Sequence, residues 1–94
     1  MKPDQIEREL NSVGKGCFVT YYQMFADESI EDREIHEALK KDFGYTENSC
    51  RLKTSHARSI IRTGNARRAM EIISESESEK VLRALALRYL EALA

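Results

Sequence analysis

Turn-forming residues are scarce in this chain, which has one proline and four glycines among its 94 residues. A sandwich or barrel needs a turn every few residues, so this scarcity disfavours an all-β fold. Apolar residues instead recur three and four positions apart, as in Ile6, Leu10 and Val13, which is the spacing of one helix face. The length allows one domain. We therefore expect an all-α fold, a small orthogonal bundle of five to six helices within a single domain, 1–94.

Helix boundaries are indicated by the turn and capping residues. Pro3 suits the first position of a helix, whereas Ser29 and Thr46 suit N-caps. Gly44 and Gly64 suit helix ends. The expected helices cover about residues 3–13, 17–26, 30–42, 47–63, 66–74 and 79–93. This pattern divides the chain into N-terminal helices (1–28), a helix-turn-helix (29–63) and C-terminal helices (64–94), of which the last is amphipathic.

The net charge of −1 conceals a segregation along the chain. Residues 1–47 carry a net charge of −5 and residues 71–94 carry −2, whereas residues 48–70 carry +6 and no acidic side chain. A local field matters more to a partner than the total charge does, so the basic segment favours a polyanion. A solvated basic face and an acidic protein partner are the alternative interpretations.

The expected helix 47–63 has two different faces when it is drawn as a wheel. One face is narrow and apolar, with small residues in its first half: Cys50, Thr54, Ala57, Ile60 and Ile61. The opposite face offers amide, guanidinium and hydroxyl groups without a negative charge. Such a helix can pack closely on a preceding helix and enter a DNA major groove, where Arg bonds guanine and Asn bonds adenine.

Two sets of DNA contacts are expected from this region. The base-reading set includes a leucine that can contact a thymine methyl group: Asn48, Arg51, Leu52 and Ser55. The set that contacts backbone phosphates consists of cations: Lys53, Arg58, Arg62, Arg67 and Arg68.

The segment 29–63 resembles the helix-turn-helix of sigma-factor region 4 and its LuxR-like relatives. In that family the first helix begins with acidic residues, and the second reads roughly T-V-K-S-R-L-S-R-A-R-x-x-L. The residues that match by type are Ser49, Cys50, Arg51, Ser55, Ala57, Arg58 and Ile61. The connection after Leu39 is longer than the family's usual turn, so we expect a first helix that is one turn longer. The resemblance implies a small sequence-specific DNA-binding protein that regulates transcription.

The last expected helix, 79–93, is apolar over more than one stripe, and Leu87 falls nearly opposite the other leucines. A helix of this kind can face both its own core and a second chain, so we expect a homodimer. The residues expected at its interface are Leu82, Leu85, Leu87, Tyr89, Leu90 and Leu93. A twofold dimer would present two basic helices to two half-sites. The alternative is that Leu87 is a single exposed leucine.

Double-stranded DNA is therefore the expected partner. The alternative is a non-enzymatic adaptor that docks another protein through the basic face or through the leucine-rich C-terminal helix. No nucleophile, base and orienting group stand at plausible spacing, so we expect no enzyme. Cys17 and Cys50 are expected to be buried and reduced, and we expect no metal and no cofactor. The chain lacks an apolar run long enough for a bilayer and an apolar leader, which favours a cytoplasmic protein without membrane contact.

Overall fold

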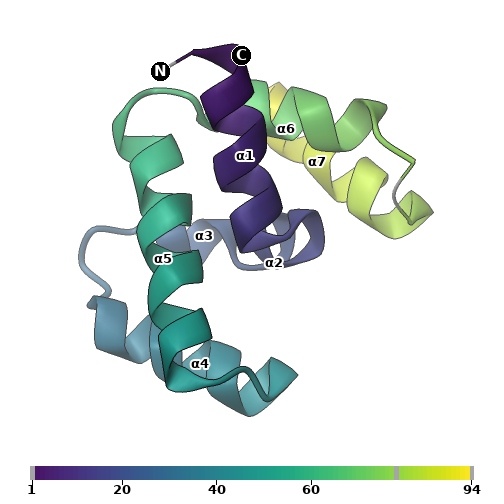
Figure 1. Cartoon of the computed structure of the whole chain (residues 1–94). Helices are drawn as coiled ribbons and strands as arrows, with labels where there is room; N and C mark the ends of the chain where they lie inside the picture. The colour runs from purple at the N-terminus through teal and green to yellow at the C-terminus, as the bar shows by residue number, and fades with distance from the viewer. Residues whose placement is uncertain (1, 78, 94) are drawn as a thin grey trace.

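The computed structural model describes residues 2–77 and 79–93, and this part of the chain contains seven α-helices and no strand. The helices are α1 (Pro3–Val13), α2 (Lys15–Thr20), α3 (Tyr22–Ala26), α4 (Asp32–Phe43), α5 (Glu47–Arg62), α6 (Ala66–Glu75) and α7 (Lys80–Leu93). The expected all-α bundle is confirmed. Helix α1 packs on α5 and α6, and α6 packs along α7 (Figure 1).

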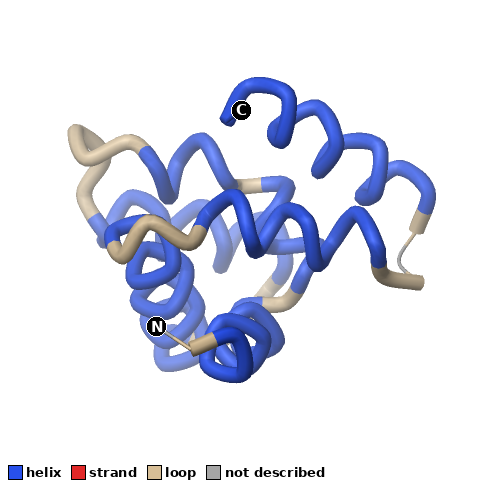
Figure 2. The backbone as a smooth tube through the Cα atoms, turned by 90° about the horizontal axis from the view of Figure 1, so that it is seen from above, coloured by secondary structure: helices blue, strands red, loops and turns tan. Residues whose placement is uncertain are grey.

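The helices surround one hydrophobic core. Its largest fully buried side chains are Leu10, Phe18, Phe25, Ile35, Leu39, Ile60, Met70 and Ile73. Every helix from α1 to α6 contributes at least one of them, and the connections between the helices are short (Figure 2). The Cα radius of gyration is 12.3 Å, close to the value of about 12 Å that a compact domain of this length is expected to have.

The stretch expected to form one helix over 17–26 is two helices that meet at Tyr21. The backbone of Tyr21 has φ −105° and ψ 15°, outside the helical region. Its ring lies edge-on to Phe43 at a centroid distance of 5.6 Å, while Phe18 and Phe25 stack in the core at 6.4 Å. Neither glycine nor proline marks this break, so the turn residues did not predict it.

The N-cap predicted at Ser29 is wrong. Both the N–H and the hydroxyl of Ser29 donate to one carboxylate oxygen of Asp27, at 2.9 and 2.6 Å. This local turn competes with helix initiation, as short polar side chains often do. Helix α4 therefore begins later, at Asp32, with Glu31 in the cap position.

The connection between α4 and α5 has only three residues, 44–46, because α4 continues to Phe43. Helix α4 thus continues about one turn beyond Leu39. Gly44 has a left-handed backbone, with φ 69°, and closes the last turn of α4. The hydroxyl of Thr46 accepts a hydrogen bond from the N–H of Ser49 at 3.2 Å, so this predicted N-cap is confirmed. The two caps fix the path of the chain into α5.

Candidate nucleic-acid interface

Helix α5 buries the narrow apolar face that its sequence predicted. The side chains of Cys50, Thr54, Ala57 and Ile60 are fully buried, and Ile61 is partly buried against the same core. The helix packs on α1 along one side and on α3 and α4 along the other. Small residues in the first half of this face allow the neighbouring helices to approach closely.

The opposite face of α5 is open to solvent. All four residues predicted to read bases are exposed on it: Asn48, Arg51, Leu52 and Ser55. They recur at the spacing of a single helix face, and we refer to them as the α5 strip. Leu52 exposes 52% of its surface near the middle of the strip. The strip thus combines amide, guanidinium, methyl and hydroxyl groups on one rigid element.

Arg58 lies inside the protein, with only 3% of its surface exposed. Its guanidinium donates five hydrogen bonds of 2.5 to 3.2 Å, four of them to main-chain carbonyls and one to the carboxylate of Asp32. The carbonyls belong to the end of α3 and the following loop: Met24, Phe25, Asp27 and Ile30. The predicted phosphate contact by Arg58 is therefore wrong, because acceptors within the chain enclose its guanidinium.

Lys53 is also engaged within the chain. Its ammonium group donates to the carbonyl of Val13 at 2.9 Å, at the C-terminal end of α1. It also lies 4.7 Å from the ring centre of Tyr45. A cation is favourable at a helix C-terminus, because the carbonyls there carry the negative end of the helix dipole. The structure thus gives Lys53 a role in joining α1 to α5, in place of a free phosphate contact.

The exposed cations of α5 are paired with carboxylates. Arg51 reaches Glu47 at 3.2 Å, one turn earlier on the same helix. Arg62 donates from two nitrogens to the two carboxylate oxygens of Glu28, at 3.1 Å each. Hydrogen bonding to Arg62 lowers the pKa of Glu28, and the same contact raises the pKa of Arg62.

The two arginines at the start of α6 share one carboxylate. Arg67 and Arg68 lie 4.0 and 3.8 Å from the oxygens of Glu71. Both arginine side chains remain about half exposed or more, at 63% and 48%. Both guanidinium groups are therefore accessible to a partner.

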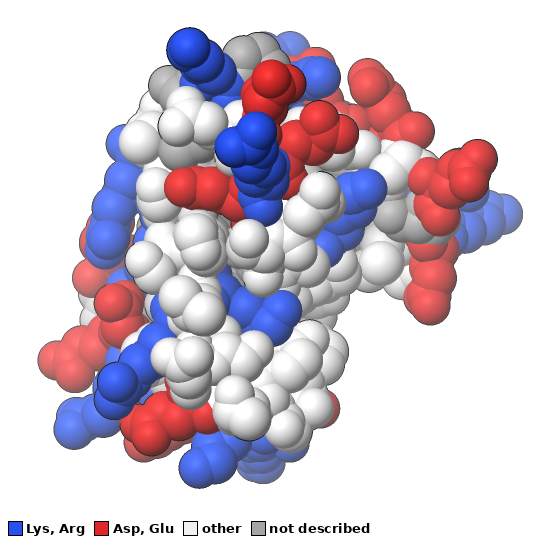
Figure 3. Space-filling model, viewed as in Figure 1, with Lys and Arg blue, Asp and Glu red and all other residues white. Residues whose placement is uncertain are grey.

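Five of the six cations of the basic segment, residues 48–70, lie within 4.0 Å of a carboxylate, although the segment itself contains no acidic side chain. Glu47 and Glu71 flank the segment, and Glu28 and Asp32 come from outside it. Figure 3 shows positive and negative side chains interspersed on the face that carries α1 and α5, rather than one continuous positive patch. Counting charges along the chain could not show this compensation, because the pairing depends on the fold.

A groove of about 350 Å³ runs beside the α5 strip. It lies where the end of α1 meets the first turns of α5, and its lining is rich in hydrogen-bond donors: Ser12, Thr46, Asn48, Ser49, Leu52, Lys53 and His56. No lining residue carries a carboxylate, although Nδ1 of His56 lies 3.8 Å from Oε1 of Glu9. Sequence reasoning missed Ser12 and His56, which only the packing of α1 on α5 brings together.

The two cysteines are buried and free, as expected. Burial raises the pKa of the Cys17 thiol to about 11, so the neutral thiol is the resting form. A second groove, of about 270 Å³ between α4 and α5, has Cys50 and His36 in its lining. Among residues 2–77 and 79–93, no group of three or more His, Cys, Asp or Glu side chains is arranged to hold a metal ion.

Helix α7 packs on α6 and α2. The residues predicted at a dimer interface therefore fall into two groups, one packed on the core and one exposed. Four of the six lie against the core of their own chain: Leu82, Leu85, Tyr89 and Leu90. Leu87 and Leu93 are exposed, at 53% and 36%. The outward side of α7 therefore contains only part of the predicted set.

No helix in the described part of the chain is long and apolar enough to cross a membrane. No protein-family model, curated protein or solved structure matches this chain. The functional interpretation is therefore based on the residues of the α5 strip and its surroundings, and not on similarity to a family.

Proposed function

We propose that this chain is a small sequence-specific DNA-binding protein, a regulator of transcription, that places α5 in the major groove. The observation that supports this proposal most is the α5 strip, in which four base-reading side chain types share one exposed helix face. Arg51 would bond a guanine, Asn48 an adenine, and Leu52 would contact a thymine methyl group. The short α4–α5 connection, with its capped ends, holds this helix in a fixed orientation.

The internal roles of Arg58 and Lys53 leave three cations for the DNA backbone. Arg62, Arg67 and Arg68 are exposed, and their carboxylate partners are exposed or half-exposed. Ion pairs at a surface contribute little to stability, because water and salt screen them. Each of these arginines can therefore exchange a carboxylate for a phosphate at little cost.

The first test is the salt dependence of binding to a labelled duplex of random sequence, followed by fluorescence anisotropy. Neutralising three phosphates for each bound chain predicts a slope of about −2.7 per chain for log affinity against log salt, or an affinity loss of about 40-fold per chain between about 50 and about 200 mM salt. A duplex selected for tight binding should show an additional contribution that depends on the sequence. Absence of binding at the lowest salt concentration would contradict the proposal.

The second test compares Arg51→Ala with Arg67→Ala on the selected duplex and the random one. Arg51→Ala should remove about 10-fold or more of the preference for the selected duplex, because a bidentate contact to guanine discriminates by about 1–3 kcal/mol. Arg67→Ala should weaken both duplexes alike. Lys41→Ala, at an exposed cation of α4, is the matched control for charge and should change neither.

A second candidate function is favoured by the carboxylates that lie among the cations of α5. A surface of mixed charge around an exposed leucine also suits a protein partner. The α5 strip, whose charged member is the cation Arg51, would then dock an acidic protein. Migration on heparin separates the two functions. A protein that is not retained by heparin, and whose DNA affinity does not respond to Arg51→Ala, would be an adaptor.

The proposed DNA-binding form is a homodimer. A twofold dimer presents two copies of a recognition helix to half-sites about 34 Å apart, as palindrome readers do. Helix α7 lies on the side of the molecule away from α5, so a partner bound there would leave both α5 strips free (Figure 1). The exposed Leu87 on α7 supports this arrangement.

A further inference from the structure

Helix α7 is more apolar than α1, α4, α5 or α6, yet it is poorly covered. Among its described residues only Ala86 is buried. One side of α7 packs on α6 and α2, where Leu82 and Tyr89 contact the core. The other side has no covering element in the described part of the chain, although it includes Val81 and Leu87, which are 73% and 53% exposed.

The middle line of this outer side consists of Lys80, Ala84, Leu87 and Glu91, all of them exposed. Their spacing of four, three and four residues is that of a coiled-coil seam. The line has a cation at its N-terminal end, an anion at its C-terminal end, and a small and a large apolar residue between them. We refer to these four residues as the α7 seam.

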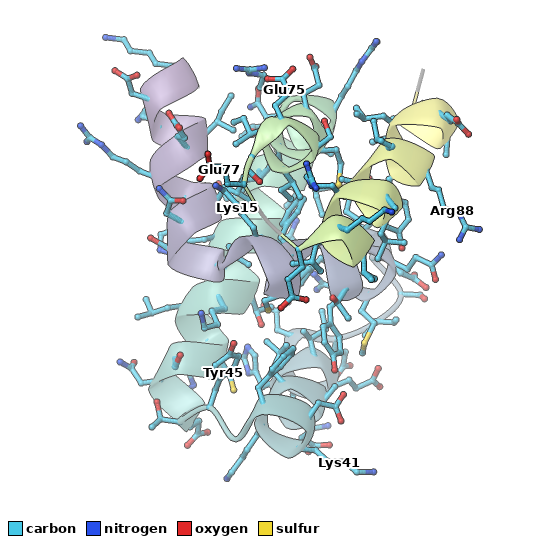
Figure 4. All side chains as sticks on the ribbon, turned by 90° about the vertical axis from the view of Figure 1, so that its right-hand side faces the viewer. Lys15, Lys41, Tyr45, Glu75, Glu77 and Arg88 are labelled. Atoms are coloured by element: carbon cyan, nitrogen blue, oxygen red, sulfur yellow. The ribbon has the colours of Figure 1, made fainter. Side chains whose placement is uncertain are left out.

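The charged side chains of α7 have no ion-pair partner in the described part of the chain. Lys80, Arg83, Arg88 and Glu91 form no ion pair with any described residue. Arg88 points away from the body of the molecule (Figure 4). By contrast, the exposed arginines of α5 and α6 are matched by carboxylates of their own chain.

We propose that a second copy of this chain binds to the α7 seam in antiparallel orientation, around a twofold axis between residues 85 and 86. In this register Lys80 meets the partner's Glu91, and Ala84 meets the partner's Leu87. Both pairs occur twice, as a twofold contact requires. A parallel arrangement would instead place Lys80 against the partner's Lys80, so the charges of the seam select the antiparallel one.

The residues that flank the seam fit the same register. Val81 would lie beside the partner's Arg88, whose aliphatic stem can cover it, and Arg83 would lie beside the partner's Leu90. No two like charges then meet on either flank. The seam covers only two heptads, so this contact forms a weak dimer whose population depends on concentration. This inference rests on the homodimer part of the proposed function and is independent of DNA binding.

Sedimentation equilibrium of the full chain without DNA, over a wide concentration range, tests the α7 seam. Lys80→Glu and Glu91→Lys each place like charges together twice, so each should weaken dimerisation by about 10-fold. The double variant K80E/E91K should restore dimerisation to within about 3-fold of the unchanged chain, because the swapped charges again attract each other. Residues 80 and 91 lie three turns apart on α7, so the swap restores no contact within one chain.

Lys41→Glu, at an exposed residue of α4 (Figure 4), is the matched control and should leave dimerisation unchanged. Far-UV circular dichroism should show the same helix content for all four variants. A chain that stays monomeric at every concentration would overturn the proposal. If neither single variant weakens dimerisation, or if the double variant does not restore it, the contact lies elsewhere and the proposal is wrong. Failure of DNA binding would leave these results unaffected.

Discussion

Arg58 and Arg62 stand about one turn apart on α5 but have opposite environments. Arg58 is enclosed by five hydrogen bonds, whereas Arg62 exposes about half of its side chain and pairs with Glu28. A helical wheel places Arg58 on a flank of the apolar face and Arg62 on the opposite side, but it cannot show that Arg58 is enclosed. The acceptors that enclose Arg58 lie 26 to 34 residues earlier in the chain, so only the tertiary fold determines which arginine is buried.

Replacing Arg58 should therefore destabilise the protein strongly. Arg58→Ala leaves the main-chain carbonyls of Phe25 and Ile30 without their side-chain donor and should cost about 3 kcal/mol or more of unfolding free energy. Arg58→Lys keeps the charge but has fewer donors and cannot reach all five acceptors, so it should fall in between. Urea unfolding followed by circular dichroism measures both. Arg62→Ala is the control, and an equal loss there would show that Arg58 has no special role.

Cys17 should make the stability fall in alkaline solution. Burial raises the pKa of this thiol from 9.0 to about 11, so the folded state favours the protonated form. The stabilisation is present below pH 9.0 and is lost as the pH rises through about 11. The urea midpoint of the unchanged chain should therefore drop over this range by more than that of Cys17→Ala. Equal drops in the two proteins would refute the assignment.

At the scale of the helix, local signals predicted most boundaries. Pro3, Thr46 and Gly44 lie at helix ends as expected, and α1, α5, α6 and α7 agree with their predicted ranges within one residue or so. The exceptions arise from contacts that compete with local preference. Tyr21 breaks a helix and packs its ring on Phe43 from α4, and Ser29 bonds Asp27 instead of capping α4. Propensity and periodicity contain no information on such partners.

The end of α4 offers a test of backbone conformation alone. Gly44 has φ 69°, and a Cβ atom added there would meet no atom within 4 Å. Gly44→Ala should therefore cost about 1 kcal/mol, from the strain of a left-handed backbone and not from a clash. Gly44→Asn should cost less, since Asn tolerates this conformation. Thermal unfolding of the two variants measures the difference, and equal melting temperatures would argue against strain as the cause.

At the scale of the whole molecule, the basic segment of the sequence becomes a surface of mixed charge. The exposure of the four residues that we propose to read bases could be predicted, because helical periodicity determines which side of α5 is apolar. Two members of the predicted phosphate-contacting set, Arg58 and Lys53, instead bond acceptors on other elements, which periodicity could not show. Glu28 approaches Arg62 only in the folded protein, because α5 must pack beside the loop that contains Glu28. Glu47 approaches Arg51 once helix α5 has formed.

This compensation predicts that removing a carboxylate will strengthen DNA binding. Glu47→Gln frees Arg51 and removes one negative charge beside the α5 strip, so affinity for duplex DNA should rise by up to about 5-fold at low salt. Glu34→Gln changes the net charge equally on α4, where Glu34 pairs with no described residue. Fluorescence anisotropy should show a smaller rise for this control. An equal rise in both variants would point to net charge alone.

The five hydrogen bonds of Arg58 also have a consequence for the order in which the chain can acquire its structure. Ribosomes add residues from the N-terminus, so the loop between α3 and α4 is complete long before Arg58 is joined to the chain. Until α5 forms, the carbonyls of Phe25 and Ile30 lack the Arg58 donor and must bond water instead. The hydrogen bonds that join this loop to α5 can therefore form only after Arg58 has been added, later than the local bond from the N–H of Ile30 to the carbonyl of Asp27.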